Sequence, residues 1–211
     1  MSETKWIEKS DIVALCKKVC ITEKGVTGEE FCEMSFTLIT VFDLVLGNAA
    51  GIVKGDMLGN TKTLQDNLKK SGKATPQEMI SDEITNGDLN KLIKDAKTST
   101  CALLWLSRAL WFIYGLLEHL CNNPTASVKD CAQAGYDQSL RPHHNFVVRN
   151  SVSLCLKAAP ERSKLIDLLG PDEPTVLNHF KDLLPHLKAI FGNNQTFLKE
   201  FKVMPKDEKP I

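Results

Sequence analysis

Residues 101–121 read CALLWLSRALWFIYGLLEHLC and form the longest apolar run in the chain. A membrane-spanning helix needs about 20 apolar residues, and an arginine near its centre, such as Arg108, costs roughly 2.5–3.5 kcal/mol on insertion scales. We therefore interpret the run as the central buried helix of an all-helical domain. Helical periodicity of about 100° per residue puts Trp105 and Arg108 on one face. Trp105 then lies either in the core or at the wall of a cavity.

The composition is that of an ordinary globular protein. A chain of 211 residues with 43% hydrophobic and 25% charged residues can bury one core, so we expect a single domain over 1–211. Lys+Arg and Asp+Glu both number 26, so no net charge favours a nucleic-acid partner. The seven cysteines include no CxxC pair, and the first residues have no apolar leader. We expect a soluble, cytoplasmic, monomeric protein.

Capping residues, prolines and glycines divide the rest of the chain into helices. The pattern predicts helices over about 11–25, 27–47, 50–70, 75–86, 88–121, 126–140, 143–159, 160–170 and 174–191. Pro185 should kink or break the last of these helices, and Gly192-Asn193-Asn194 should interrupt it. A charged tail, about 202–211, ends the chain. We find no alternating strand pattern, and the predicted fold class is all-α.

Two places carry polar or aromatic groups in suggestive positions. Asp56 and Asn60 stand one turn apart on one face of a predicted helix. A carboxylate and an amide at this spacing can hold vicinal hydroxyls, although a solvated helix face gives the same pattern. Trp105 offers a flat apolar surface on which a sugar ring can stack, and a core tryptophan is the alternative.

A third place is His143-His144, which follows Pro142. Adjacent residues at the start of a helix point about 100° apart, so the two imidazoles make a poor joint metal site. The chain has no GxSxG, Walker, GxGxxG or HExxH motif. We therefore expect no enzymatic activity, no metal and no other cofactor.

Three segments together carry a family resemblance. They are GDMLGN (55–60), ALLWLSRALWFI (102–113), and HHNFVVRN (143–150) with KAAP (157–160); Phe42-Asp43 precedes Asp56 by thirteen residues. In this order and spacing the chain resembles the glycolipid transfer protein family over roughly 30–190. The resemblance implies a two-layer, all-helical sandwich that encloses an apolar lipid pocket. It also implies non-enzymatic transport of a sphingolipid between membranes.

The resemblance implies a role for each matching residue. Asp56 and Asn60 would bind sugar hydroxyls, Asp56 would also accept from the ceramide amide N–H, and Trp105 would stack under the sugar. His144 would donate to the amide carbonyl. The family's headgroup lysine falls at Thr63, so we expect the neighbouring Lys62 to reach the headgroup. The expected pocket lining, for which plain core is the alternative, is Phe42, Phe146, Val152, Cys155 and Leu156.

The headgroup class depends on Trp105 and on Cys101, one turn earlier. The branch of the family that carries ceramide-1-phosphate resembles this chain in fold but has arginines at both positions, so the uncharged residues here favour a neutral glycosylceramide. Alternatives are a ceramide-1-phosphate carrier in which Arg108 and Lys62 bind the phosphate, a glycolipid sensor, and a helical adaptor without lipid. We expect transient, reversible contact with membranes. The candidates for an aromatic contact patch are Trp6, Trp111, Phe112 and Tyr114, and burial in the core is the alternative, expected for at least half of them.

Overall fold

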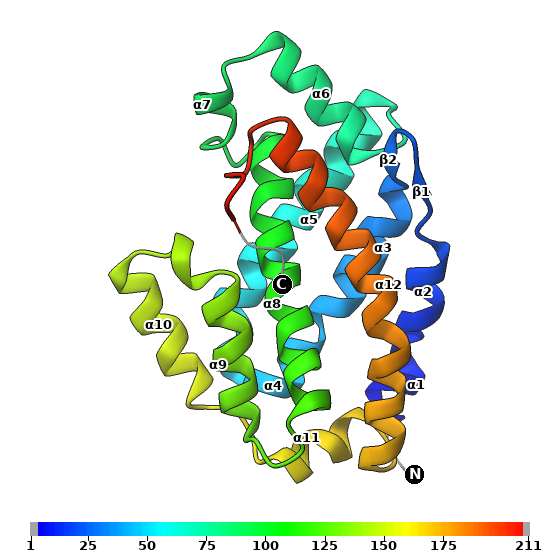
Figure 1. The fold of residues 1–211 in the computed structure, drawn as a ribbon, viewed down its shortest axis with the longest axis vertical. Helices are drawn as coiled ribbons and strands as arrows, with labels where there is room; N and C mark the ends of the chain where they lie inside the picture. The colour runs from blue at the N-terminus through cyan, green and yellow to red at the C-terminus, as the bar shows by residue number, and fades with distance from the viewer. Residues whose placement is uncertain (1–3, 209–211) are drawn as a thin grey trace.

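Helix α8, Ser99–Asn122, runs through the middle of the molecule and contacts α5, α9 and α12 (Figure 1). The computed structural model describes residues 4–208, apart from the side chains of residues 48, 50 and 52. The helices form a two-layer sandwich: α8, α9 and α12 lie toward the viewer in Figure 1, with α3, α4 and α5 behind them. This is the predicted fold class, and the core lies between the layers.

The elements follow one another in this order along the chain. They are α1 Trp6–Ser10, α2 Ile12–Lys18, β1 Ile21–Thr22, β2 Gly25–Val26, α3 Gly28–Ile39, α4 Val41–Leu46, η1 Gly47–Ala50, α5 Gly51–Ser71, α6 Pro76–Asn86, α7 Leu89–Leu92, α8 Ser99–Asn122, α9 Val128–Gln138, η2 Arg141–His143, α10 Phe146–Leu156, α11 Arg162–Leu169 and α12 Glu173–Glu200.

The burial of α8 confirms that it is the central core helix. Thr98 caps its N-terminus by accepting a hydrogen bond from the amide of Cys101. Within residues 4–208 it is the one helix whose length and composition would suit a membrane, yet 94% of its most apolar window is buried inside the protein. A helix that is apolar all round needs neighbours on every side, and the two layers supply them.

The chain between α2 and α3 departs from the sequence prediction of a helix that runs to Gly25. Helix α2 ends at Lys18, and Ile21 pairs with Val26 in a two-residue antiparallel ladder. Gly25 has φ 121°, which an α-helix cannot contain. Since the side chain of Val26 is fully buried while Ile21 is exposed, the hairpin anchors this connection on the core.

Helix α12 is continuous through Pro185 and through Gly192-Asn193-Asn194, where an interruption is predicted. Pro185 faces solvent. Asn193 and Asn194 accept hydrogen bonds at 3.2 and 2.7 Å from the amide of Gln77 on α6, so their side chains do not compete for the backbone of their own helix. Leu198, fully buried beyond this point, keeps the last turns of α12 on the core.

The aromatic membrane patch is wrong, and the alternative, burial in the core, holds for all four candidates. Trp6, Trp111, Phe112 and Tyr114 are all buried. The indole of Trp6 donates to the Thr40 hydroxyl at 2.8 Å, between α3 and α4. The ring of Trp111 meets that of Tyr114 edge-on, with centroids 5.1 Å apart.

Candidate functional site

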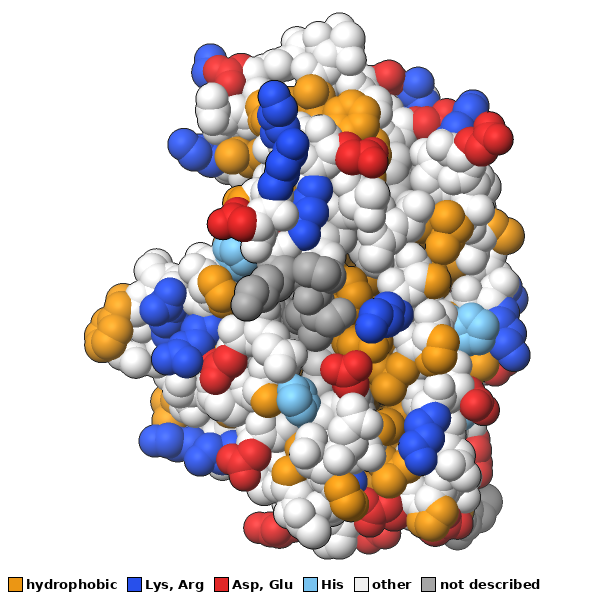
Figure 2. All heavy atoms as spheres, in the orientation of Figure 1, with side chains coloured by type: hydrophobic (Ala, Val, Ile, Leu, Met, Phe, Trp, Pro, Cys, Tyr) orange, Lys and Arg blue, Asp and Glu red, His pale blue; other side chains and the backbone are white. Residues whose placement is uncertain are grey.

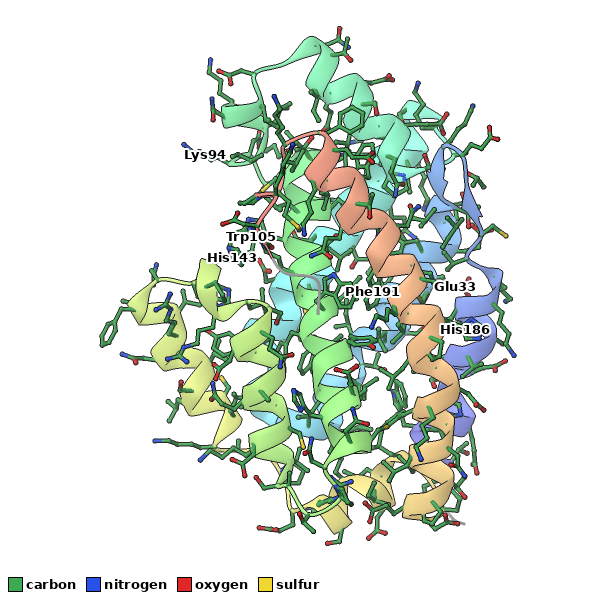
Figure 3. All side chains as sticks on the ribbon, viewed as in Figure 1. Glu33, Lys94, Trp105, His143, His186 and Phe191 are labelled. Atoms are coloured by element: carbon green, nitrogen blue, oxygen red, sulfur yellow. The ribbon has the colours of Figure 1, made fainter. Side chains whose placement is uncertain are left out.

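A cavity of about 440 Å³ lies between α5, α8, α9 and α10. Figure 2 shows the edge of the molecule indented between α7 and α10, and Figure 3 places Lys94 and Trp105 along this edge. Most of the lining is apolar, and its polar side chains are few. The lining consists of Val53, Asp56, Met57, Asn60, Lys94, Ala96, Cys101, Trp105, Ala109, Phe112, Tyr136, Leu140, His144, Val148 and Val152. Such a cavity suits a long apolar molecule with one polar end.

Asp56 and Asn60 form a hydrogen-bonded pair at the cavity. The amide of Asn60 donates to a carboxylate oxygen of Asp56 at 3.2 Å. Burial raises the pKa of Asp56, and the Asn60 hydrogen bond partly opposes this rise. Asp56 is nevertheless an exposed residue, whereas Asn60 is buried. The pair therefore presents acceptor and donor atoms together at the surface end of the site.

The side chains of Trp105, on α8, and His144, in the turn before α10, face each other. Their rings are nearly parallel, at 20°, with centroids 6.1 Å apart. The hydroxyl of Tyr136, on α9, lies 3.0 Å from Nδ1 of His144. Burial lowers the pKa of His144, and the positive charges of nearby histidine and arginine side chains lower it further, so its imidazole is neutral at pH 7. When the Tyr136 hydroxyl is the donor to Nδ1, the proton of the imidazole is on Nε2, which can then donate to a ligand.

Arg108 is one turn beyond Trp105 on the same face of α8. Its Cζ lies 5.2 Å from the centroid of the Trp105 ring, within the range of a cation–π contact. Nε and Nη2 of Arg108 donate to the two carboxylate oxygens of Glu208 at 3.0 and 2.8 Å. Nε2 of His143 lies 3.2 Å from the same carboxylate.

Four of the predicted headgroup residues, Asp56, Asn60, Trp105 and His144, line this one cavity together with Val152. Their roles toward a ligand remain predictions. Lys62 lies elsewhere: it is exposed and its ammonium pairs with Asp66 at 3.3 Å on the outside of α5. Successive side chains of a helix are rotated by about 100°, so Lys62 points to a different side of α5 from position 63, where the family has its headgroup lysine.

Four residues predicted to line the pocket are outside its lining. Phe42 is fully buried and packs on Phe112, a lining residue, with ring centroids 5.1 Å apart. Phe146, the first residue of α10, is 76% exposed and lies at the protein surface. Cys155 is half-buried and Leu156 is buried, and neither reaches the cavity.

Sequence reasoning missed Tyr136 and Glu208. A buried tyrosine hydroxyl needs a hydrogen-bond partner, but one sequence does not say which residue supplies it. The lone Arg108 in an apolar helix similarly demands an acidic partner. Nothing in the sequence of the tail identifies Glu208, 100 residues away, as that partner.

Helix α10 carries an exposed apolar face beside the cavity. Phe146, Val147 and Leu154 are 76%, 70% and 68% exposed. Figure 1 shows α10 at the edge of the molecule, packed beside α9, and Figure 2 shows Lys and Arg side chains around it. Exposed apolar side chains gathered on one helix face mark a contact surface.

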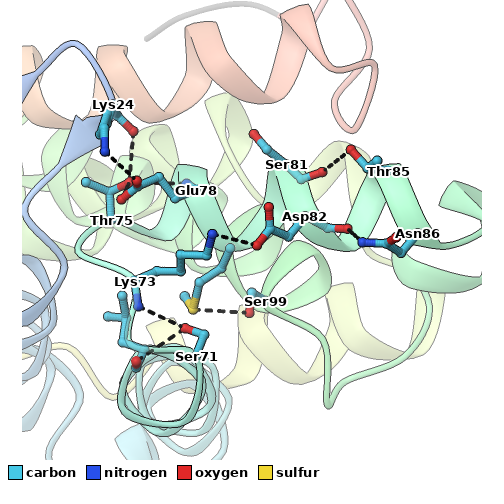
Figure 4. Close-up of polar contacts among 12 residues, drawn as sticks. Lys24, Ser71, Lys73, Thr75, Glu78, Ser81, Asp82, Thr85, Asn86 and Ser99 are labelled. Carbon is cyan, nitrogen blue, oxygen red and sulfur yellow. Dashed lines mark hydrogen bonds and ion pairs between the residues drawn. The ribbon is translucent and has the colours of Figure 1, made fainter.

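A larger cavity, about 640 Å³, lies beside β1, β2, α6 and α12. Four of its charged side chains form ion pairs: Lys24 with Glu78 at 3.1 Å, and Lys73 with Asp82 at 2.7 Å (Figure 4). We assign it no ligand. Over residues 4–208, no three His, Cys, Asp or Glu side chains are grouped so that they could hold a metal ion.

Comparison with known proteins agrees with this geometry. The family model described as "Glycolipid transfer protein (GLTP)" matches residues 26–171. A glycolipid transfer protein of Aureobasidium melanogenum is 30% identical over 169 residues, which cover 80% of this chain and 81% of that protein. The crystal structure of HET-C2, a fungal glycolipid transfer protein, superposes with a TM-score of 0.77 at 27% identity, covering 92% of this chain and 97% of that one.

The fold extends to carriers of another headgroup. Human ceramide-1-phosphate transfer protein, solved in complex with 12:0 ceramide-1-phosphate, has a TM-score of 0.80 at 19% identity, covering 92% of this chain and 96% of that one. At this identity the likeness concerns the fold alone. The all-helical sandwich with its mainly apolar cavity defines a lipid transfer protein. The chain belongs to the glycolipid transfer protein family.

Proposed function

We propose that this protein is a monomeric, non-enzymatic carrier of glycosphingolipids with a neutral sugar headgroup. The observation that supports this most directly is the meeting of Asp56, Asn60, Trp105 and His144 at one mainly apolar cavity. The cavity takes the hydrocarbon chains, and the polar residues hold the headgroup at the surface. Carrying the lipid needs no covalent bond to be made or broken. It needs only that the apolar chains be kept from water.

Each polar residue has a partner in this proposal. Asp56 accepts from sugar hydroxyls and from the ceramide amide N–H, and Asn60 both donates and accepts. Nε2 of His144 donates to the amide carbonyl. A buried amide left without such partners would cost about 1–3 kcal/mol for each unpaired group. The sugar ring stacks on Trp105.

Helix α10 is the membrane contact in this proposal. Phe146, Val147 and Leu154 would enter the interface, while the basic side chains around them face the headgroups. The formal net charge of zero keeps binding to anionic lipids weak and therefore reversible, as a cytoplasmic shuttle requires. The adjacent cavity would then open toward the bilayer surface from which the lipid comes.

The test is intervesicle transfer of a fluorescent glycosylceramide, run beside a fluorescent ceramide-1-phosphate. We expect transfer of the glycosylceramide. Asp56→Asn should reduce it about 10- to 150-fold, because hydrogen bonds to a charged group contribute about 1.5–3 kcal/mol. Asp66→Asn is the matched control, since Asp66 is on the same helix but pairs with Lys62 and does not line the cavity.

The outcomes separate the alternatives. Transfer of ceramide-1-phosphate in place of the glycosylceramide would mean that Arg108, not Trp105, sets the headgroup class. Binding of glycosylceramide without transfer would indicate a sensor. Failure of the folded protein with both lipids would contradict the proposal.

A further inference from the structure

The C-terminal tail, residues 201–208, folds back toward the central helix. Beyond the end of α12 the amides of Val203 and Met204 both donate to the carbonyl of Leu198, at 2.9 and 3.0 Å. The side chains of Val203 and Met204 are buried. These contacts fix the direction in which the tail leaves α12, and the tail reaches α8 at Glu208.

Basic groups from three elements converge on Glu208. Arg108 of α8 binds its carboxylate with two hydrogen bonds, and His143 at the end of η2 lies 3.2 Å from it. The ammonium of Lys199, on α12, donates to the Glu208 backbone carbonyl. Only 9% of the Arg108 side chain and 13% of the Glu208 side chain are exposed. The arrangement is therefore a largely desolvated ion pair and not a surface contact.

The ion pair adjoins the headgroup site. Arg108 lies 5.2 Å from the Trp105 ring, and His143 immediately precedes His144; both Trp105 and His144 line the cavity. A carboxylate that accepts two parallel bonds from a guanidinium occupies the same donor fork that a phosphate would use. Glu208 thus occupies the donor fork of Arg108 next to the candidate headgroup site.

We propose that Glu208 is a specificity-determining residue, whose carboxylate occupies Arg108 and thereby excludes phosphate-bearing lipid headgroups from the neighbouring site. The proposal rests on the proposed function as a lipid carrier. A phosphate at the site would either face a second negative charge in a poorly solvated place or displace Glu208 from its partners. Both alternatives are costly, because a buried charge that loses its partner is strongly destabilising. A neutral sugar requires neither.

The carboxylate stays ionised over the whole neutral range. Burial, the largest single cause, would raise the pKa of Glu208, but the hydrogen bonds and positive charges of Arg108 and His143 together outweigh it and bring the pKa to about 2. The negative charge is therefore present at any pH at which the carrier would meet a membrane.

The test is Glu208→Gln in the full chain, with intervesicle transfer of fluorescent ceramide-1-phosphate and fluorescent glycosylceramide measured side by side. We expect the ratio of the phosphate-lipid rate to the glycolipid rate to rise at least tenfold. Asp207→Asn is the matched control: it removes one negative charge from the same tail at an exposed position, and its ratio should stay at the wild-type value. In Arg108→Gln/Glu208→Gln the gain should disappear, because the guanidinium is gone.

Thermal unfolding establishes that each variant is folded, and Glu208→Ser, which also removes the carboxylate, serves as the second variant if Glu208→Gln is not. An unchanged ratio in folded Glu208→Gln or Glu208→Ser would overturn the proposal. An equal rise of the ratio in Asp207→Asn would also overturn it. So would a wild-type protein that already transfers ceramide-1-phosphate as fast as the variant does. The rate of glycosylceramide transfer by the wild type tests the proposed function separately. The difference in ceramide-1-phosphate transfer between the wild type and the Glu208 variant does not depend on that rate.

Discussion

The hydroxyl of Tyr136 lies 3.0 Å from Nδ1 of His144, at hydrogen-bonding distance, and this contact holds the imidazole ring in its orientation at the cavity. The two residues come from α9 and from the turn before α10, so the bond also fixes these elements to each other. Because the pKa of His144 is lowered, the ring has one proton at neutral pH, and this proton is on Nε2 when the Tyr136 hydroxyl is the donor to Nδ1. The geometry therefore makes Tyr136 a positioning residue for the headgroup site.

Tyr136→Phe should weaken glycosylceramide binding about two- to tenfold, since a hydrogen bond of this kind contributes about 0.5–1.5 kcal/mol. Titration of a fluorescent glycosylceramide into the protein measures the change. The chain's other tyrosine is the matched control: Tyr114 donates to Glu118 at 2.9 Å and does not line the cavity, so Tyr114→Phe should bind as the wild type does. Equal effects of the two substitutions would refute the positioning role.

Acid should destabilise the protein in two steps. The pKa values of His144 and His179 are lowered from 6.5, mainly by burial, so the unfolded chain binds more protons as the pH falls through 6.5. The free energy of unfolding should therefore decrease below about pH 6.5. Glu208, with its pKa lowered to about 2, stabilises the fold fully above pH 4.5 and loses that contribution between about pH 4.5 and 2. The raised pKa of Asp56 acts in the opposite direction near pH 4.

Urea unfolding at a series of pH values checks this prediction. His144→Gln/His179→Gln should flatten the profile between pH 6.5 and 5, and Glu208→Gln should flatten it below pH 4.5. A wild-type protein that gains stability between pH 6.5 and 5 would contradict the expected direction of the histidine contribution.

The sequence predicted the helices well where a cap and an apolar period agreed. Thr75 accepts from the amide of Glu78, as the capping box before α6 requires, and α8 ends within one residue of its predicted C-terminal bound. The prediction of one helix over 88–121 was wrong at its start, because residues 93–98 separate α7 from α8. The prediction of helices failed where tertiary contacts override local signals. Gly192-Asn193-Asn194 is a strong local breaker, but hydrogen bonds from Gln77, 117 residues away from Asn194, keep this segment helical.

In the candidate site, too, local rules predicted some residues correctly, and only the tertiary fold determines the others. Asp56 and Asn60 were found because a helix places i and i+4 on one face, a local rule. Phe146 was misplaced because an apolar residue at the start of a helix can face inward or outward, and only the packing of α10 decides. Glu208 lies in a tail whose composition resembles that of any solvated segment. Its pairing with Arg108 is a product of the tertiary fold.

The Gln77 amide should be important for stability and not for binding. It accepts from the amide of Val26 at 3.3 Å and donates to Asn194 at 2.7 Å, and both of these partners are fully buried. Gln77→Ala leaves two buried polar groups without this partner, at about 1–3 kcal/mol each, so we expect a loss of at least about 2 kcal/mol in the free energy of unfolding.

The control is Gln133→Ala, which removes an exposed hydrogen bond to Asp137 and should change the free energy of unfolding by no more than about 0.5 kcal/mol. Glycolipid transfer per folded molecule should be equal in both variants, and its selective loss in Gln77→Ala would contradict this separation.

Gly115 of α8 and Gly135 of α9 lie against each other with no room for a side chain between the two backbones. A Cβ on Gly135 would lie 2.8 Å from the backbone nitrogen of Leu116 and 2.9 Å from the carbonyl oxygen of Phe112, atoms that cannot move aside without moving α8. Gly135→Ala should therefore destabilise the protein by about 1–3 kcal/mol, the usual cost of overpacking, and push α9 away from α8. Since α9 carries Tyr136, the variant should also lose its orienting bond to His144.

The matched control for this substitution is Gly192→Ala in α12. A Cβ there meets no atom within 4 Å, so the alanine should stabilise the helix by about 0.5–1 kcal/mol. Urea unfolding measures both changes, which have opposite signs for the same chemical substitution. We further expect glycosylceramide transfer by Gly135→Ala to fall at least as far as in Tyr136→Phe, at a temperature where the variant is fully folded. Transfer at the wild-type rate would mean that the spacing of α8 and α9 does not control the site.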